Sequence, residues 1–336
     1  MFKQKYDHDV IMVIVNHGDA SKVVEFSRQH GSHGATILPG SGTRRNSWLE
    51  KLGLNEVRRE LVFMVVESTH TAPLLDALRV EFEMDKPGKG IAIAMPIDWA
   101  FGIHQAPTEE RINKDPFNHH CHLICTIVDR SYGEDVVALG DEAGVNGATL
   151  VHGYGTAERG EKVFDFPIEP EKDLVFMIVE DNFEEVFAYM KNAMHLDKPN
   201  SGIQFVMPVT YSVGLYREDG DTPRNEHAGH CAEETEKVAL HLITAPNVLD
   251  HALQVADQVG VGGATHLPAR GATSRESLKI FNLPLEPRKE WITIITDRAK
   301  AEKLTFEWRE QLAIDAPGQG ILFAIRVLKD VGLYEG

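Results

Sequence analysis

The sequence predicts an α+β fold in which one structural unit of about one hundred residues occurs three times. The evidence is a set of landmarks that return in the same order along the chain. Gly-Ala-Thr occurs at residues 34–36, 147–149 and 263–265, with spacings of 113 and 116 residues. An apolar run occurs at 61–67, 174–180 and 291–297. A turn that begins Asp-Lys-Pro or Asp-Ala-Pro occurs at 85–87, 197–199 and 315–317.

Each unit is predicted to contain strand, helix, strand, strand, helix and strand in that order. The first strands, at 10–15, 123–128 and 238–243, are short apolar runs rich in β-branched residues. The helix that follows carries an apolar stripe and stops at Gly31, Gly144 or Gly260. Second helices are expected at 73–82, 184–194 and 301–312, and last strands at 91–96, 203–208 and 321–327. This βαββαβ order is that of a ferredoxin-like unit, with two helices on one face of a four-stranded antiparallel sheet.

The other face of each sheet needs a cover, because the last strands at 91–95 and 321–325 are apolar on both faces. Three tandem ferredoxin-like units could bury these faces against each other. We therefore expect a single-chain pseudo-trimer, a monomer that imitates a homotrimer, with units at 8–102, 119–216 and 235–334.

Composition excludes several classes of protein. The chain of 336 residues has 34 basic and 51 acidic side chains, a net charge of −17, which opposes binding to nucleic acids and to anionic membranes. Three cysteines form no pairs at metal or disulfide spacing. The apolar run at 10–15 is too short for a signal peptide or a membrane span. We therefore expect a cytoplasmic protein without membrane insertion.

The connection between the second and third strands of each unit is long enough to be functional, at residues 40–59, 153–172 and 269–289. It opens on spaced glycines, which allow a backbone to approach an anion closely, although tight turns need glycine too. A second glycine loop, Gly88-Lys89-Gly90, adds a cation in the first unit. Since both motifs recur in each unit, we predict a site for a small anionic ligand.

These residues resemble the PII signal-transduction (nitrogen regulatory) family. The resemblance rests on Gly-Ala-Thr leading into Gly-x-Gly-Thr, on the long loop that closes at residues 168–172, and on Pro-Gly-Lys-Gly-Ile at 87–91. It covers all three units. It implies a trimeric assembly that binds adenine nucleotides (ATP, ADP or AMP) between subunits and regulates a partner enzyme or transporter through the long loops.

The resemblance also implies which residues face the ligand. In the first unit they are Gly40, Gly42, Thr43, Gly88, Lys89 and Gly90. In the second they are Gly153, Gly155, Thr156 and Gly202, and in the third Gly271, Gly318 and Gly320. The basic residues at the foot of the loops are Arg59, Lys172 and Lys289.

The three units differ at these positions, so three identical ligand sites are not expected. Asn200-Ser201 replaces Gly88-Lys89, Gln319 replaces the lysine again, and Ala269 replaces the first glycine of the loop. The arginine pair that nitrogen regulators carry after the last strand has no counterpart. Loop cations could compensate or could be solvated charges: Arg44, Arg45, Arg159, Lys162, Arg270 and Arg275.

Two other functions remain open from the sequence. The first is a metal-handling protein like the trimeric CutA family, with weak candidate ligands His119, His120, His122, His227 and His230, whose spacing matches no closed zinc site. The second is an interaction scaffold with vestigial clefts. The sequence holds no known catalytic motif, so we expect a regulator rather than an enzyme, with no certain cofactor.

Overall fold

The computed structural model describes residues 8–43, 56–103, 121–145, 147–156, 162–163, 166–167, 170–180, 182–215, 236–261, 263–273, 278–280, 283–285 and 287–333. The three sequence repeats form a first segment (8–103), a second segment (121–215) and a third segment (236–333).

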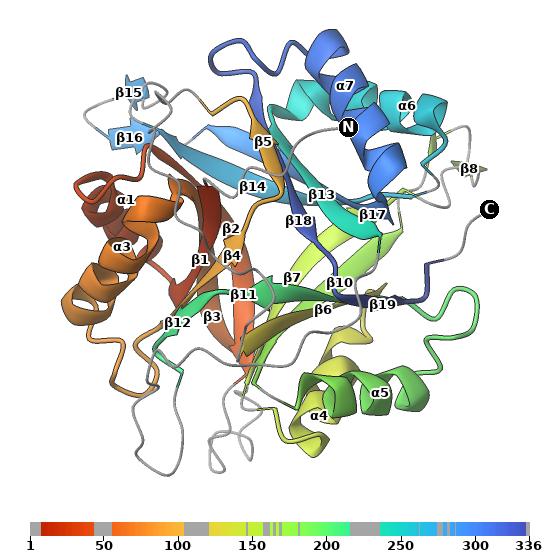
Figure 1. Ribbon diagram of the computed structural model, residues 1–336, viewed down its shortest axis with the longest axis horizontal. Helices are drawn as coiled ribbons and strands as arrows, with labels where there is room; N and C mark the ends of the chain where they lie inside the picture. Colours follow the sequence, from red (N-terminus) through yellow and green to blue (C-terminus); the bar gives the residue numbers. More distant parts are fainter. Residues whose placement is uncertain are drawn as a thin grey trace.

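Strands and helices follow one another in a similar order in all three segments (Figure 1). The first contains β1 (His8–Asn16), α1 (Ala20–Arg28), β2 (Gly34–Thr43), β3 (Glu56–Glu67), α3 (Ser68–Glu81), β4 (Ile91–Pro96) and β5 (Trp99–Phe101). The second contains β6 (Cys121–Asp129), α4 (Gly133–Glu142), β7 (Ala148–Gly155), β8 (Lys162–Val163), β9 (Phe166–Pro167), β10 (Glu171–Val179), α5 (Phe183–Ala193), β11 (Ile203–Val209) and β12 (Tyr211–Val213). The third contains β13 (Lys237–Thr244), the 3-10 turn η1 (Pro246–Val248), α6 (Leu249–Val259), β14 (Thr265–Thr273), β15 (Leu278–Ile280), β16 (Leu283–Leu285), β17 (Arg288–Asp297), α7 (Arg298–Gln311), β18 (Gly320–Arg326) and β19 (Lys329–Val331).

The way these strands assemble corrects the predicted fold class. Hydrogen bonds join fifteen of them into one curled antiparallel sheet, whose main path runs β12-β4-β1-β3-β2-β14-β7-β10-β6-β11-β19, while β8 pairs with β9 and β15 with β16 in two small separate sheets. The prediction of three tandem ferredoxin-like units, each with its own four-stranded sheet and packed as a single-chain pseudo-trimer, is therefore wrong. The physical reason is that an open strand edge carries unpaired N–H and C=O groups, and these edges pair between segments instead of ending each sheet.

Two sets of strand pairs make these connections. In the first set, β2, β7 and β14 pair with one another: β2 pairs with β14 and β7, and β14 also pairs with β7. In the second set, a short strand that follows each last long strand pairs with another segment, β5 with β18, β12 with β4 and β19 with β11. Each segment therefore forms strand pairs with both of the other segments.

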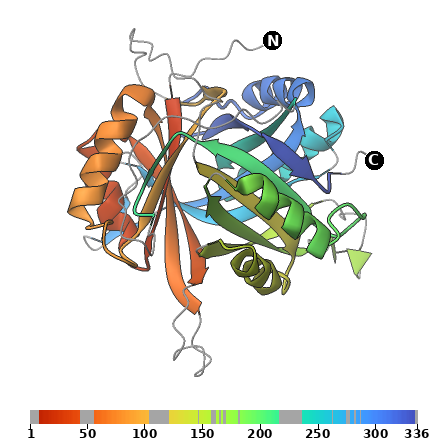
Figure 2. The ribbon, with the colours of Figure 1, turned by 60° about the horizontal axis from the view of Figure 1, so that its bottom comes forward.

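Both faces of the sheet are buried, as the apolar strands predict. Helices cover the outer face, where separate clusters of buried side chains form beneath the helices of each segment (Figures 1 and 2). The inner face of all three segments contributes to one central core, which includes Met12, Phe63, Cys125, Phe205 and Phe323.

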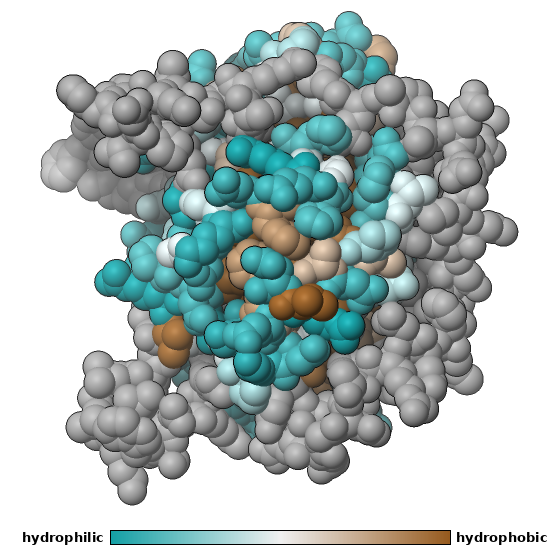
Figure 3. Space-filling model, turned by 90° about the vertical axis from the view of Figure 1, so that its left-hand side faces the viewer, coloured by the Kyte–Doolittle hydropathy of each residue, from teal (hydrophilic) through white to brown (hydrophobic). Residues whose placement is uncertain are grey.

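The side of the molecule that carries α1 and α3 is mostly hydrophilic among the described residues (Figure 3). In this view, hydrophobic side chains gather near the centre of the face and hydrophilic ones surround them. The large exposed hydrophobic residues belong to different parts of the fold: Val80, Tyr132, Tyr189 and Phe306. Among the described helices, none combines the length and the apolar composition that a membrane crossing requires.

The central core also contains a buried imidazole, His241 of β13. It pairs with Thr293 and Phe323 on the neighbouring strands, at the place that Met12 of β1 occupies between β3 and β4. Burial lowers the pKa of His241 from 6.5 to about 3. The folded protein therefore keeps this ring neutral at pH values where an unfolded chain would protonate it.

We expect this imidazole to make the protein less stable as the pH falls from 6.5 towards 3. In that range the unfolded state takes up a proton on His241 and the folded state does not, which costs about 1.4 kcal/mol per pH unit. The substitution His241→Met should remove this contribution. Urea unfolding of both proteins at pH 8 and pH 5 tests this prediction. Between pH 8 and pH 5, the free energy of unfolding of the wild type should fall by about 2 kcal/mol more than that of the variant. An equal difference at both pH values would contradict the prediction.

Candidate functional site

The structure brings the predicted basic residues and loop glycines together in all three segments. A Cβ atom built on Gly42 would lie 2.8 Å from Cγ of Arg59. The same construction on Gly155 and Gly271 meets Cε of Lys172 at 2.8 Å and Cε of Lys289 at 3.0 Å. The glycine therefore makes room for the stem of the cation across the strand pair. This packing role is one reason for glycine at these positions, whatever they bind.

In the first segment the second glycine loop joins this pair. Nη1 of Arg59 donates to Oδ1 of Asn16, at the end of β1, and makes a long contact of 3.5 Å with the carbonyl oxygen of Gly88. Nδ2 of Asn16 also donates to the Gly88 carbonyl, at 3.3 Å. Three stretches that are far apart in the sequence, around residues 42, 59 and 88, thus meet around one guanidinium group.

The second segment arranges the equivalent cation differently. Lys172 forms an ion pair with Asp129, which occupies the place of Asn16 at the end of its strand. The charge of Lys172 is therefore balanced by a carboxylate, whereas the partner of Arg59 at the same place is a neutral amide.

The side chain of Lys89 contacts an acidic residue of its own turn. Its Nζ lies 3.0 Å from Oε2 of Glu83, and the lysine side chain is about half exposed. Lys86 and Lys89, through hydrogen bonds and charge, hold the pKa of the Glu83 carboxyl below its usual value. Lys89 is thus part of an exposed turn network after α3 and has a role there independent of any ligand.

The glycines at the start of the last long strands, Gly90 and Gly202 just before β4 and β11 and Gly320 as the first residue of β18, are required by packing. Gly90, Gly202 and Gly320 have φ angles of 153°, 121° and 158°. A Cβ on them would lie 3.0, 2.7 and 2.6 Å from the carbonyl oxygens of Ile14, Ile127 and Ile243, respectively. Close approach of the backbone to the preceding first strand therefore requires glycine here.

Other predicted ligand residues lie where segments meet. A Cβ on Gly40 would be 3.0 Å from the carbonyl oxygen of Leu150, and one on Gly153 would be 2.7 Å from that of His266. The Thr156 hydroxyl accepts from the backbone N–H of Ala264 at 2.8 Å. Gly318, at φ 83°, lies in a turn, and Thr43 ends β2.

The histidine-based metal hypothesis gains no support from the described residues. His119, His120, His227 and His230 lie outside them. His122 is buried, and its ring lies 3.9 Å from that of Phe183, centroid to centroid. No group of three or more histidine, cysteine or acidic side chains suited to a metal occurs within the described ranges.

Sequence reasoning missed a carboxylate that occupies the same place in each segment and is buried in the first two. Glu60, Asp173 and Glu290 lie on β3, β10 and β17, opposite Pro39, His152 and Pro268 of the preceding strands. The signal was present: each follows the basic residue at the foot of the loop, in Arg59-Glu60, Lys172-Asp173 and Lys289-Glu290.

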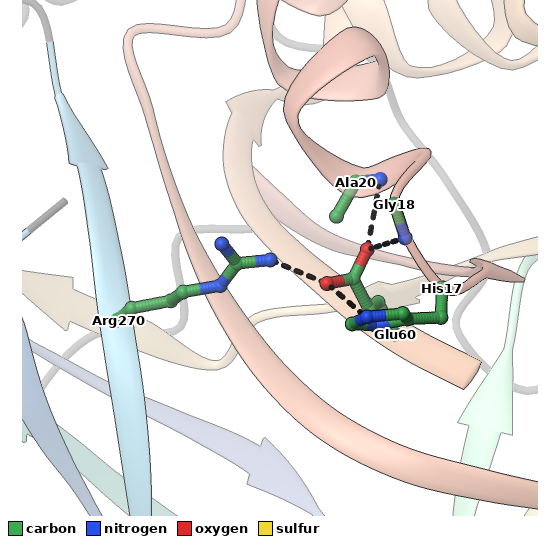
Figure 4. A network of polar contacts seen from close by, with 5 residues as sticks. All are labelled: His17, Gly18, Ala20, Glu60 and Arg270. Atoms are coloured by element: carbon green, nitrogen blue, oxygen red, sulfur yellow. Dashed lines mark hydrogen bonds and ion pairs between the residues drawn. The ribbon is translucent and has the colours of Figure 1, made fainter. Parts of the chain in front are cut away.

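Glu60 forms the largest of these networks (Figure 4). Its side chain is 5% exposed, and its Oε2 accepts hydrogen bonds from the backbone N–H groups of Gly18 and Ala20 at 2.9 and 3.2 Å. Its Oε1 accepts from Nη2 of Arg270, on β14 of the third segment, at 2.5 Å and lies 3.5 Å from Nδ1 of His17. Arg270 is therefore not simply a solvated loop charge. Glu60 fills the anion site at the start of α1 and ties the first segment to the third.

Asp173 repeats part of this arrangement. Its Oδ2 accepts from the backbone N–H groups of Ser131 and Gly133, and its Oδ1 lies 2.7 Å from Nδ1 of His152. The His152 side chain is 48% exposed, so a buried carboxylate orients an imidazole that solvent can reach.

In the third segment, Glu290 pairs with His266, whose Nδ1 is 3.3 Å from Oε2. The His266 ring stacks on Tyr154 of the second segment, with ring centroids 5.3 Å apart. Each of the three carboxylates thus contacts a histidine, but the three histidines are not at equivalent positions in the repeat. Glu60 was absent from the predicted site because its partners Gly18 and Arg270 are 42 and 210 residues away in the sequence.

Comparison with known proteins identifies no family. No protein-family model and no curated protein matches the sequence. Two solved structures show weak likeness. An anthrone oxidase-like protein has 6% identity and a TM-score of 0.19, over 63% of this chain and 95% of its own. Aspartate kinase from Synechocystis has 9% identity and a TM-score of 0.21, over 96% of this chain and 52% of its own. At these scores neither structure supports a shared fold or a shared function.

Proposed function

We propose that this protein is a regulator that binds a small anionic ligand, with an adenine nucleotide as the first candidate, and acts on a partner protein through its long connections. The observation that carries the proposal is the meeting of Gly42, Arg59 and the Gly88 carbonyl in the first segment. These are residues that the PII resemblance assigns to ligand binding. No enzymatic step is part of the proposal.

The first segment is the favoured site. Arg59 is held by the neutral side chain of Asn16, whereas Lys172 is held by the carboxylate of Asp129. A guanidinium offers an anion two parallel N–H donors, whereas the Lys172 ammonium offers a single point charge that is already paired with Asp129. Charge-assisted hydrogen bonds from a guanidinium are among the strongest that a phosphate can accept.

Ligand binding at this site would affect the partner protein through the connection between β2 and β3. Arg59 is the fourth residue of β3, so a ligand bound to it would touch the base of this connection. Ligand binding would then change the population of connection conformers that fit the partner.

A thermal-shift screen with matched variants tests this function. We expect wild-type protein to be stabilised by one member of a panel of ATP, ADP, AMP, cyclic AMP, 2-oxoglutarate and bicarbonate, by about 2.7 kcal/mol at 100 times the dissociation constant. Arg59→Ala should lower the affinity for that ligand by about 10- to 100-fold, because a charge-assisted hydrogen bond contributes about 1.5–3 kcal/mol.

The control is Lys172→Ala, which removes the equivalent cation in the second segment. It should leave the ligand affinity within about twofold, since the proposed site lies in the first segment. Equal losses in both variants would remove the preference for the first segment. A panel without any shift would reject the ligand-binding function and favour the interaction scaffold, and a shift with divalent metals alone would favour metal handling.

A further inference from the structure

Three short strands link the segments into a ring, because β5 pairs with the third segment, β12 with the first and β19 with the second. The residue directly before each short strand makes the same contact. The backbone N–H groups of Asp98, Thr210 and Leu328 each donate to a carbonyl oxygen of another segment at 2.8 Å. These residues therefore occupy equivalent places at the three junctions, with a carboxylate at one junction and uncharged side chains at the other two.

The carboxylate of Asp98 is buried against cations of the third segment. Its side chain is 1% exposed, and its Oδ2 accepts a hydrogen bond from Nη1 of Arg298 at 2.6 Å. Nη2 of Arg326 lies 3.9 Å from the same oxygen. The side chains of Arg298 and Arg326 are 22% and 11% exposed, and Arg298 also lies 3.5 Å from Glu302 of its own helix. Two largely buried guanidinium groups of one segment thus hold a buried carboxylate of another.

The aromatic side chains of β5 add contacts with α7 of the third segment. Nε1 of Trp99 donates to Oγ1 of Thr305 at 3.2 Å, and the guanidinium carbon of Arg298 lies 4.8 Å from the centroid of the Trp99 ring. The guanidinium carbon of Arg309 lies 3.9 Å from the centroid of the Phe101 ring. The third segment thus binds β5 through the backbone of β18 and through side chains of α7. In this kind of strand addition, backbone pairing supplies affinity and side chains supply specificity.

The first segment does not offer the same cations at the equivalent places. Arg326 pairs with the second residue of β13, whereas Pro96 and Pro208 pair with the second residues of β1 and β6. Arg298 begins α7, and Ser68 begins α3. A strand carrying Asp98 that docked on the first segment would therefore bury its carboxylate without either guanidinium, and a buried charge without its partner is strongly destabilising.

We propose that the ion pairs of Asp98 with Arg298 and Arg326 form a lock that selects the third segment as the place where β5 docks. The lock closes the ring between two segments that are not consecutive in the chain, so no direct connection holds this junction together. The ion pair of Glu60 with Arg270 joins the same two segments and supports the same closure. The inference is independent of the proposed function, since no residue of the lock belongs to the proposed anion site.

Hydrogen exchange of the full-length protein, followed by mass spectrometry, tests the lock. Asp98→Ala should accelerate exchange about 100-fold at residues 98–101 and 322–324, because two largely buried cations lose the carboxylate that joins β5 to β18. Residues 92–94 and 204–206, at the other two junctions, should stay within about threefold of the wild type, because those junctions open independently. Equal acceleration at all three junctions would show a general loss of stability and would overturn the proposal. Unchanged exchange at residues 98–101 would overturn it too.

A double-mutant cycle with milder substitutions tests the pairing itself. Asp98→Asn and Arg298→Gln keep much of the side-chain shape, and each should accelerate exchange at residues 98–101 about 10-fold. In the double variant the acceleration should be smaller than the product of the two, because the second substitution removes a partner that the first has already disabled. An acceleration equal to the full product would show that the two side chains do not act together and would overturn the lock.

The control is Asp330→Asn, on β19. Asp330 forms an ion pair with Lys237, which belongs to the same segment, so this substitution removes a carboxylate from a short strand without removing a contact between segments. Exchange at residues 98–101 should stay within about twofold of the wild type. The milder variants keep the proposal testable if Asp98→Ala does not fold.

Discussion

Replacing Gly214 by alanine is expected to lower the free energy of unfolding by about 3 kcal/mol. Gly214 follows β12, the short strand by which the second segment pairs with β4 of the first. Its φ angle is 79°, and a Cβ atom there would lie 2.3 Å from the carbonyl oxygen of Gly90. The substitution combines a left-handed backbone with a clash against another segment's backbone, which cannot move aside as a flexible side chain would.

Gly260→Ala is the matched control. Gly260 has nearly the same φ angle, 84°, but a Cβ atom there would have nothing within 4 Å. It should cost about 1 kcal/mol, the price of the left-handed conformation alone. Urea unfolding monitored by circular dichroism measures both values. Equal losses would mean that the contact between Gly214 and Gly90 contributes nothing. Gly102 and Gly332 make equivalent contacts with Gly320 and Gly202 and should behave like Gly214.

Glu60→Ala should destabilise the protein by about 3 kcal/mol. The substitution leaves two backbone N–H groups at the start of α1 without their acceptor and removes the ion pair with Arg270. Most of the loss comes from the amides and the buried contacts. The Arg270 side chain is 37% exposed, so water can solvate its charge once the carboxylate is gone.

A double-mutant cycle separates the contribution of the ion pair. Glu60→Gln retains an acceptor for Gly18 and Ala20 and should cost about half as much as Glu60→Ala. Arg270→Ala should cost less than either, and the loss in the double variant should be smaller than the sum of the single losses. Strict additivity would show that Glu60 and Arg270 do not interact in solution.

The successes of sequence reasoning concern local patterns. The predicted first strands lie inside β1, β6 and β13, and Gly260 ends α6 in the left-handed conformation. These features follow from residue periodicity and from backbone preferences within a few residues. The prediction placed the start of one helix at residue 73, whereas α3 begins at Ser68. The backbone there is helical before Pro73, and the apolar pattern alone did not reveal it.

The candidate site was predictable in part. Gly42 and Arg59 were both implied by the PII resemblance, and they meet because β2 and β3 are adjacent antiparallel strands. Their connection to Asn16 and Gly88 could not be read from the sequence. It depends on how β1 and the loop before β4 are placed beside β3. The carboxylate of Glu60 was overlooked although its position repeats, because its partners Gly18 and Arg270 are 42 and 210 residues away.

The sequence by itself determined the three repeats, their long strands and helices, and the burial of both strand faces, but not the short strands β5, β12 and β19. Only the tertiary structure decided that the strands form one continuous sheet, which glycines face another segment's backbone, and which groups surround Glu60, Arg59 and His241. The reason is physical. Hydrophobic periodicity reports whether a face is buried, but it does not report which strand edge satisfies another's hydrogen bonds or which charge is balanced by which partner.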